Sequence, residues 1–133
     1  MPPSFAHHLR VRYNECDPQG IVFNANYVTY VDVTLTELWR EWFGSYQAFI
    51  DQTGIDLVVA DLQLRFRGSA RFDDELAITL DPQLTSASSV TSTIAIDRGA
   101  DRLIDGTIRH VCVDARSFAK VPAPALLTAV LRP

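Results

Sequence analysis

The chain has 133 residues, a length typical of one small domain rather than of a two-domain enzyme. Apolar residues make up 47% of it and charged residues 21%, the balance of a globular protein with a buried core. Twelve basic against sixteen acidic residues give a formal net charge of -4, which disfavours nucleic acid and acidic membrane surfaces as partners. We therefore expect residues 1–133 to form a single domain that binds neither nucleic acid nor membrane.

Targeting and metal-binding patterns are also missing from the sequence. The longest apolar run is Leu57–Ala60, far short of the roughly 20 residues that a membrane helix needs. The N-terminal residues contain no basic stretch followed by an apolar one, so we expect a cytoplasmic protein. Cys16 and Cys112 are too few for a disulfide framework and have no zinc-ligand spacing, so reduced thiols and no metal are expected.

The first elements follow from local patterns. Apolar and polar residues alternate over Leu9–Tyr13, which predicts a strand. The sequence Asp-Pro-Gln-Gly at 17–20 has the residue preferences of a type I turn. After Asn24 or Asn26, either of which could cap a helix, apolar residues recur at three-to-four spacing as far as Gly44. They are Tyr27, Tyr30, Val31, Leu35, Leu38, Trp39 and Trp42, and they predict one long amphipathic helix.

The rest of the chain is rich in β-formers. A weak signal predicts a short helix near 46–50, closed by Thr53-Gly54. Four β-rich runs follow at 56–67, 75–85, 88–97 and 102–114, and a short terminal helix is expected from Pro122. Their connections are too short for crossover helices, so neighbouring runs should pair antiparallel. The predicted fold is α+β, a five-stranded antiparallel sheet with one long helix on its apolar face, and the poorly covered second face favours self-association.

Chemistry-bearing residues gather at 13–27, between the first strand and the helix. The first N–H groups of a helix have no intrahelical partner and carry a partial positive charge, so they can bind an oxygen that gains negative charge. The carboxylate of Asp17, on the turn across from those groups, could attack a polarised carbonyl carbon or activate a water. This arrangement favours transfer of an acyl group to water.

Structural roles compete with this interpretation. An aspartate at the first turn position very often only accepts a hydrogen bond from the backbone two residues on, and Asn24 and Asn26 could be plain helix caps. Cys16 lacks an evident base, so a buried apolar role is expected for it. A second carboxylate, Asp32, lies ~12 Å along the helix from Asn24, too far to share that oxyanion site within one chain.

The stretch from Tyr13 to Asp32 contains the pattern Tyr-x-x-x-Asp-Pro-x-Gly-Ile-Val-x-x-x-Asn-Tyr. It resembles the 4-hydroxybenzoyl-CoA thioesterase family of hotdog-fold enzymes, and the likeness continues more loosely through 71–76. The resemblance implies the hotdog fold, in which a sheet wraps around one long helix, and hydrolysis of an acyl-CoA thioester to free acid and thiol.

The resemblance also implies roles for individual residues. Asp17 would be the catalytic nucleophile or general base, and the backbone N–H of Asn24 would polarise the thioester carbonyl. The residues matching the loop that shapes the substrate site and the start of the helix are Tyr13, Gly20, Val22, Phe23, Asn26 and Tyr27. The resemblance implies no cofactor, and a homodimer or homotetramer with each site at a subunit interface.

Two departures from the family pattern leave alternatives open. Asn24 stands where many relatives have histidine, so the backbone role is the one carried over. The bend at 86–88 lacks the basic residues that meet the nucleotide phosphates of coenzyme A in the namesake branch. An acyl carrier protein as the acyl donor, and a non-catalytic acyl-binding hotdog module, therefore remain alternatives. A hotdog dehydratase is discounted because it needs a histidine, and none lies in the Asp17 cluster.

Overall fold

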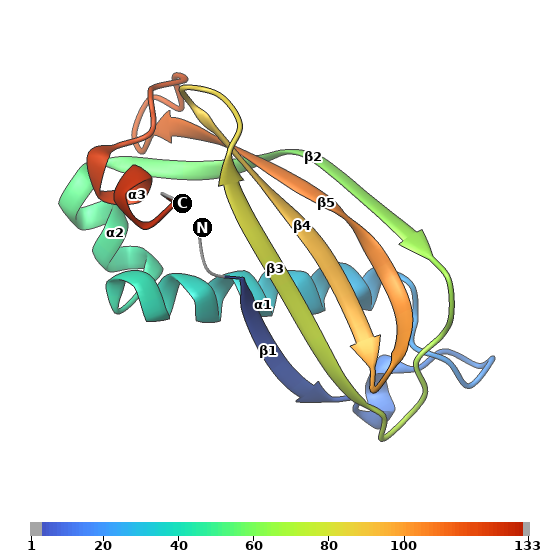
Figure 1. The fold of residues 1–133 in the computed structure, drawn as a ribbon. Helices are drawn as coiled ribbons and strands as arrows, with labels where there is room; N and C mark the ends of the chain where they lie inside the picture. The colour runs from blue at the N-terminus through green and yellow to red at the C-terminus, as the bar shows by residue number, and fades with distance from the viewer. Residues whose placement is uncertain (1–3, 132–133) are drawn as a thin grey trace.

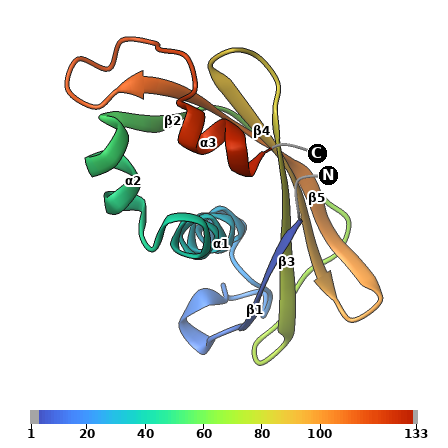
Figure 2. The same cartoon turned by 60° about the vertical axis from the view of Figure 1, so that its left-hand side comes forward.

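The computed structural model describes residues 4–131, which form a curved sheet and three α-helices (Figure 1). In chain order the elements are β1 (Phe5–Arg10), the 3-10 turn η1 (Tyr13–Glu15), α1 (Ala25–Phe43), α2 (Tyr46–Thr53), β2 (Ile55–Phe66), β3 (Glu75–Leu84), β4 (Ser89–Arg98), β5 (Asp101–Asp114) and α3 (Ala125–Val130). The five strands form one antiparallel sheet in the order β1-β3-β4-β5-β2. The sheet curves around α1, which Figure 2 shows nearly end-on. The predicted α+β class and the long helix against a five-stranded sheet are confirmed.

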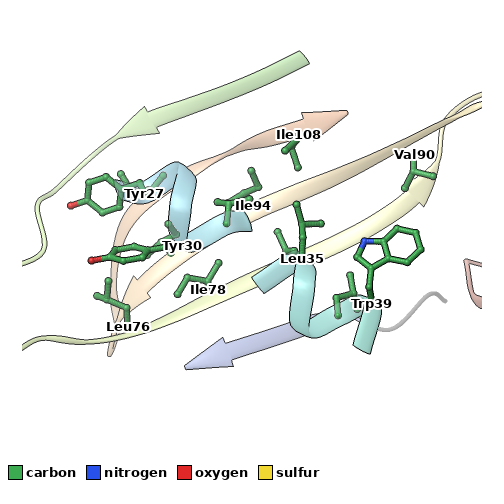
Figure 3. Packing of buried hydrophobic residues seen from close by; sticks show 14 of the residues in the cluster. Tyr27, Tyr30, Leu35, Trp39, Leu76, Ile78, Val90, Ile94 and Ile108 are labelled. Carbon is green, nitrogen blue, oxygen red and sulfur yellow. The ribbon is translucent and has the colours of Figure 1, made fainter. Parts of the chain in front are cut away.

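The core lies between α1 and the concave face of the sheet (Figure 3). Ile78, Ile94 and Ile108 project from β3, β4 and β5 and are buried with Tyr30 and Leu35 of α1. Each such side chain contributes about 1.5–3 kcal/mol when it is fully removed from water. Of the apolar helix positions predicted from spacing, all are buried except Trp42, which is partly exposed.

Two glycines end helices where the sequence indicated. Gly44 has a φ of 84°, a backbone conformation that favours glycine, and its N–H donates to the carbonyl of Arg40 at 2.8 Å. Gly54 ends α2 in the left-handed conformation, and Ser45 caps the start of α2 by accepting a hydrogen bond from the N–H of Ala48 at 3.0 Å. The short helix is therefore confirmed, three residues longer than expected.

The first strand differs from its prediction. β1 ends at Arg10 rather than at Tyr13, and residues 13–15 form a 3-10 turn instead. The cause is local, because the N–H of Arg12 donates to the Glu15 carboxylate at 2.8 Å and the N–H of Glu15 donates to the Arg12 carbonyl at 3.0 Å. Tyr13 consequently leaves the buried face on which the alternation placed it, and 81% of its surface is exposed.

The prediction that all consecutive runs pair is wrong for β2 and β3. β2 pairs with β5 at one edge of the sheet, whereas β3 lies between β1 and β4. The connecting residues 67–74 cross the ends of β5 and β4, and the N–H groups of Arg67 and Gly68 both donate to the carbonyl of Leu103 on β5. The terminal helix also begins later than expected, at Ala125 rather than at Pro122.

The outer face of the sheet is turned away from α1 (Figure 2). Its positions on the central strands are mostly polar, and they include Thr79, Asp81, Thr91, Thr93, Asp105, Thr107 and Arg109. Exposed apolar side chains do occur on the edge strand β2, where 56% of Val59 is exposed. Because α1 packs most closely on β1 and β3, part of the concave face of β2 around Val59 stays exposed, although Leu57, Leu62 and Leu64 pack against the core. Among the helices of residues 4–131, none has both the length and the apolar character to cross a membrane.

Candidate functional site

Asp17 lies on a tight turn that closes like a small hairpin between η1 and α1. Its N–H donates to the Ile21 carbonyl and its own carbonyl accepts from the Gly20 N–H, both at 2.9 Å. Cys16 and Val22 form an antiparallel bridge at the base of this loop. Gly20 has a φ of 81°, a conformation that glycine adopts without strain. The predicted turn at 17–20 is therefore confirmed.

The two oxygens of the Asp17 carboxylate have different surroundings. Oδ1 accepts a hydrogen bond of 2.8 Å from the N–H of Gln19, which is the structural role expected for an aspartate at this position. Oδ2 has no hydrogen-bond donor within residues 4–131. The half-buried side chain lines a hollow of about 540 Å³ together with Tyr13, Asn14, Cys16, Pro18, Gly20 and Phe72, called the Asp17 hollow below. One oxygen thus holds the turn while the other remains available.

The start of α1 follows directly after this loop. Phe23 donates its N–H to the Glu15 carbonyl at 2.9 Å, and Asn26 donates its N–H to the Phe23 carbonyl at 2.8 Å. The N–H of Asn24, between them, has no acceptor in the part of the chain that the structure describes. Neither asparagine is a side-chain cap, since Asn24 makes no cap hydrogen bond and the Asn26 amide donates to the Glu15 carbonyl at 2.8 Å. The helix therefore begins with an unpaired donor.

Glu15, which the sequence did not single out, ties the turn to the helix. Its carboxylate accepts hydrogen bonds from the backbone and guanidinium of Arg12 and, at 2.9 Å, from the hydroxyl of Tyr30. Burial alone raises the pKa of Glu15, but these hydrogen bonds outweigh it and hold the pKa below its usual value. Burial and the neighbouring carboxylate raise the pKa of Tyr30 strongly. The Arg-x-x-Glu spacing just before Asp17 was the signal that could have indicated this role.

The remaining predicted site residues do not all meet in one place. Tyr13, Asp17 and Gly20 line the Asp17 hollow, whereas Val22, Phe23, Asn24, Asn26 and Tyr27 lie outside its lining. Val22 and Tyr27 belong to the core, and the Tyr27 hydroxyl accepts the N–H of Ala70 at 3.0 Å. Phe23 and Asn24 are exposed. The sequence missed Phe72, which comes from the distant 71–74 turn and completes the wall of the hollow.

A second hollow of about 220 Å³ lies between α1, α2 and the open parts of β2 and β5. Its lining, which defines the helix hollow below, is Asp32, Leu35, Thr36, Trp39, Tyr46, Leu57, Val59 and His110. Burial lowers the pKa of His110, while the nearby carboxylate of Asp32 opposes that shift. An imidazole and a carboxylate thus face a mostly apolar space, the mixture expected of a small-molecule pocket.

The start of α1 and the helix hollow lie at different positions along the helix axis. Asp32 is eight residues beyond Asn24 on α1, which corresponds to ~12 Å of rise. Trp39, at the far end of the helix hollow, is seven residues farther along. A single chain therefore presents the unpaired donor at Asn24 and the helix hollow at separate positions.

Comparison with protein families places this geometry in context. Residues 19–104 match the model of the thioesterase superfamily. The chain belongs to this superfamily. The matched segment includes Gly20, the helices α1 and α2, the strands β2 to β4 and the beginning of β5, whereas Asp17 and β1 precede it.

Two curated members of the superfamily illustrate the likeness in sequence. A 1,4-dihydroxy-2-naphthoyl-CoA hydrolase of Thermosynechococcus vestitus is 24% identical over 123 residues, covering 92% of this chain and 84% of that protein. The acyl-CoA thioester hydrolase YbgC of Escherichia coli O6:H1 is 29% identical over 107 residues, covering 80% of this chain and 79% of that protein. Superfamily membership and these relatives support thioester hydrolysis as the reaction.

Solved thioesterase structures confirm the hotdog fold. A 1,4-dihydroxy-2-naphthoyl-CoA thioesterase from Synechocystis superposes with a TM-score of 0.86 at 20% identity, covering 97% of this chain and 96% of that chain. The gentisyl-coenzyme A thioesterase BH1999 superposes with a TM-score of 0.82 at 20% identity, covering 96% of this chain and 99% of that chain. At this identity the similarity concerns the fold.

Proposed function

We propose that the protein hydrolyses small acyl-CoA thioesters, with Asp17 as the catalytic carboxylate and the N–H of Asn24 as the donor to the carbonyl oxygen. The observation that carries the proposal is the free Oδ2 of Asp17 in an open hollow, one short loop away from an unpaired N–H at a helix start. The turn at 17–20 agrees with the role proposed for Asp17, and the superfamily match over residues 19–104 supports thioester hydrolysis.

The reaction needs few groups. Oδ2 of Asp17 either bonds to the thioester carbon or removes a proton from a water that bonds to it, and the carbonyl π electrons move onto the oxygen. The N–H of Asn24 donates to that oxygen, at the end of a 19-residue helix that carries a partial positive charge. When the C=O bond re-forms, the C–S bond breaks and the thiolate leaves to be protonated by water. In the nucleophilic route, water then cleaves the resulting anhydride.

The acyl group needs a pocket, and we assign it to the helix hollow. A volume of about 220 Å³ suits a compact acyl group such as one aromatic ring better than a long chain. The names of a gentisyl-coenzyme A thioesterase and of a 1,4-dihydroxy-2-naphthoyl-CoA hydrolase among the similar proteins agree with aromatic acyl groups. His110 and Asp32 would then meet hydroxyl groups on the ring.

Because the two hollows are separate within one chain, we propose that a second copy supplies the helix hollow for each Asp17. β2 is an unpaired sheet edge within the structure, with Val58 and Val59 exposed on it. An exposed apolar edge strand favours pairing with another strand. A homodimer joined along β2 would bring both parts of the site together. The cytoplasmic location of the protein stays a prediction.

The donor is proposed to be coenzyme A rather than an acyl carrier protein. The bend at 86–88 has no basic residue of its own, but Lys120 lines the same hollow of about 360 Å³ as Ser86 and Ser88. This is the single lysine of the chain, and its exposed ammonium can bind a phosphate. An acyl carrier protein as the acyl donor would depend less on a phosphate contact with Lys120.

The decisive experiment is Asp17→Asn. The asparagine side chain still offers an oxygen to the N–H of Gln19, so the turn and the fold should be retained while kcat falls at least about 100-fold. A panel of aromatic and linear acyl-CoA thioesters is assayed by release of free thiol. Asp81→Asn, on the outer face of β3, is the matched control and should hydrolyse them normally.

The outcomes separate the two functions under consideration. Full thiol release by the Asp17→Asn protein would reject Asp17 as the catalytic group. Thermal stabilisation of the unaltered protein by acyl-CoA without any thiol release would instead favour a non-catalytic acyl-binding module.

A further inference from the structure

The aromatic side chains of Tyr13 and Phe72 line the Asp17 hollow and are exposed to solvent. Tyr13 and Phe72 are 81% and 56% exposed, and they pack edge to face with ring centroids 5.8 Å apart and planes at 85°. Both line the hollow beside Asp17. Large aromatic side chains usually bury most of their surface, so two that contact each other outside the core form an apolar surface available to a ligand.

The turn that carries Phe72 is fastened at several points. The N–H of Asp73 donates to the Val11 carbonyl at 3.0 Å, and the N–H of Val11 donates to the Asp74 carbonyl at 2.9 Å. The guanidinium of Arg10 donates to the Asp73 carbonyl at 2.8 Å. The turn is thereby joined to the strand that leads into Tyr13.

This turn also contains backbone strain next to Phe72. Asp73 has a φ of 72°, a conformation that costs a residue other than glycine about 1–3 kcal/mol. It is maintained because the Asp74 carboxylate accepts hydrogen bonds from the N–H of Arg71 at 2.8 Å and from Arg98 at 2.9 Å. Strain that the surroundings enforce is common where a side chain is displayed for function.

We infer that Tyr13 and Phe72 form a docking wall for the pantetheine arm of the thioester substrate, an inference that rests on the proposed function. The thioester carbon must lie at Asp17, so the acyl group and the sulfur-linked arm extend from it in different directions. The smaller helix hollow suits the compact acyl group, which leaves the larger Asp17 hollow, about 540 Å³, for the arm. That arm alternates amide groups with apolar carbons, and the exposed rings beside the side-chain amide of Asn14 match this alternation.

The test removes one ring and shortens the substrate. One acyl group is attached in turn to coenzyme A, to pantetheine and to N-acetylcysteamine, which lacks most of the arm. In the full-length Phe72→Ala protein, KM for the first two thioesters should rise about tenfold, the effect of losing an aromatic contact of ~1.4 kcal/mol. KM for the N-acetylcysteamine thioester should change less than about twofold, because this short substrate cannot reach the ring.

Two further variants control for the loss of a ring in general. Phe118→Ala removes an aromatic side chain that is 61% exposed and lies outside the lining of the Asp17 hollow, so all three substrates should be hydrolysed as before. Phe72→Tyr keeps a ring on the turn and should restore the KM values for coenzyme A and pantetheine thioesters.

An equal rise in KM for all three substrates would overturn the inference, since the Phe72 ring would then act on the acyl group or through the turn. Unchanged KM values in Phe72→Ala would overturn it as well. A change of oligomeric state in size-exclusion chromatography, with equal losses on every substrate, would assign the rings to a contact between copies instead. If Asp17→Asn is inactive in the same assays, the proposed function stands whichever result Phe72→Ala gives.

Discussion

The hydroxyl of Tyr30, in the second turn of α1, donates a hydrogen bond of 2.9 Å to Oε1 of Glu15, two residues before Asp17. The Glu15 side chain is only 12% exposed, and its main-chain carbonyl accepts the N–H of Phe23 and the side-chain amide of Asn26. One residue therefore fixes both ends of the loop that carries Asp17. The placement of the carboxylate relative to the helix start depends on this contact.

Tyr30→Phe should weaken both the fold and catalysis. Removing the hydroxyl leaves a mostly buried carboxylate with one donor fewer, which should lower the free energy of unfolding by about 1–3 kcal/mol. Urea unfolding followed by circular dichroism measures this change. Because the loop would loosen, kcat should fall more than KM rises. An unchanged kcat at saturating acyl-CoA would show that the contact does not position Asp17.

Stability should decrease on acidification because of Glu15. The folded protein holds the pKa of Glu15 below its usual value of 4.5, so the ionised group stabilises the fold above that pH. This contribution is lost as pH falls through the depressed pKa of the folded state. Glu15→Gln should be less stable than the unaltered protein at pH 7, and the difference should shrink below about pH 4. Urea unfolding at several pH values checks this. A difference in the free energy of unfolding between the two proteins that does not vary with pH would show that Glu15 is not the group responsible.

Lys120→Ala should distinguish coenzyme A from shorter donors. Loss of the ammonium beside the 86–88 bend should raise KM for an acyl-CoA about three- to tenfold and leave the matching pantetheine thioester unaffected. The effect should diminish at 1 M salt, where charges are screened within about 3 Å. Arg116→Ala, an exposed cation on the same connection after β5, serves as the control. Equal KM values for the variant and the unaltered protein would remove Lys120 from the substrate site.

Val58→Lys should separate the copies that the proposed site requires. Val58 is exposed on the outer side of the edge strand β2, away from the helix hollow, and a charge there disfavours pairing of two edges. Sedimentation should show a smaller species with thioesterase activity reduced at least about tenfold, because Asp17 then lacks its acyl pocket. Thr93→Lys, on the outer face of the central strand β4, should change neither property. An active monomer would contradict the shared site.

Local patterns in the sequence predicted much of the fold, because periodicity and turn chemistry are local properties. The long helix, its end at Gly44 and the turn around Asp17 all depend on residues close in sequence. The strand order was not predictable in this way, since β2 and β3 are adjacent in sequence but lie on opposite sides of β4 and β5. The actual order depends on contacts between distant residues.

The same distinction explains the candidate site. Asp17 stands in a recognisable motif, whereas Phe72 reaches the hollow only because its turn is bonded to Val11. In the sequence, His110 cannot be told from an ordinary strand residue. Only the folded sheet brings it together with Asp32 in the lining of the helix hollow. Tyr13 shows the converse error, because the alternation that placed it on a strand ends where the Glu15 carboxylate captures the N–H of Arg12.

The hydrogen bond from Gln19 to Oδ1 makes the two oxygens of Asp17 inequivalent before any substrate arrives. The carboxylate plane is held by its own loop, so rotation about the last side-chain bond is restricted and Oδ2 has a set direction. In the proposed reaction, the entropy of ordering this carboxylate is lost when the chain folds rather than at the moment of reaction, so less of the binding energy of the thioester is spent on orienting it.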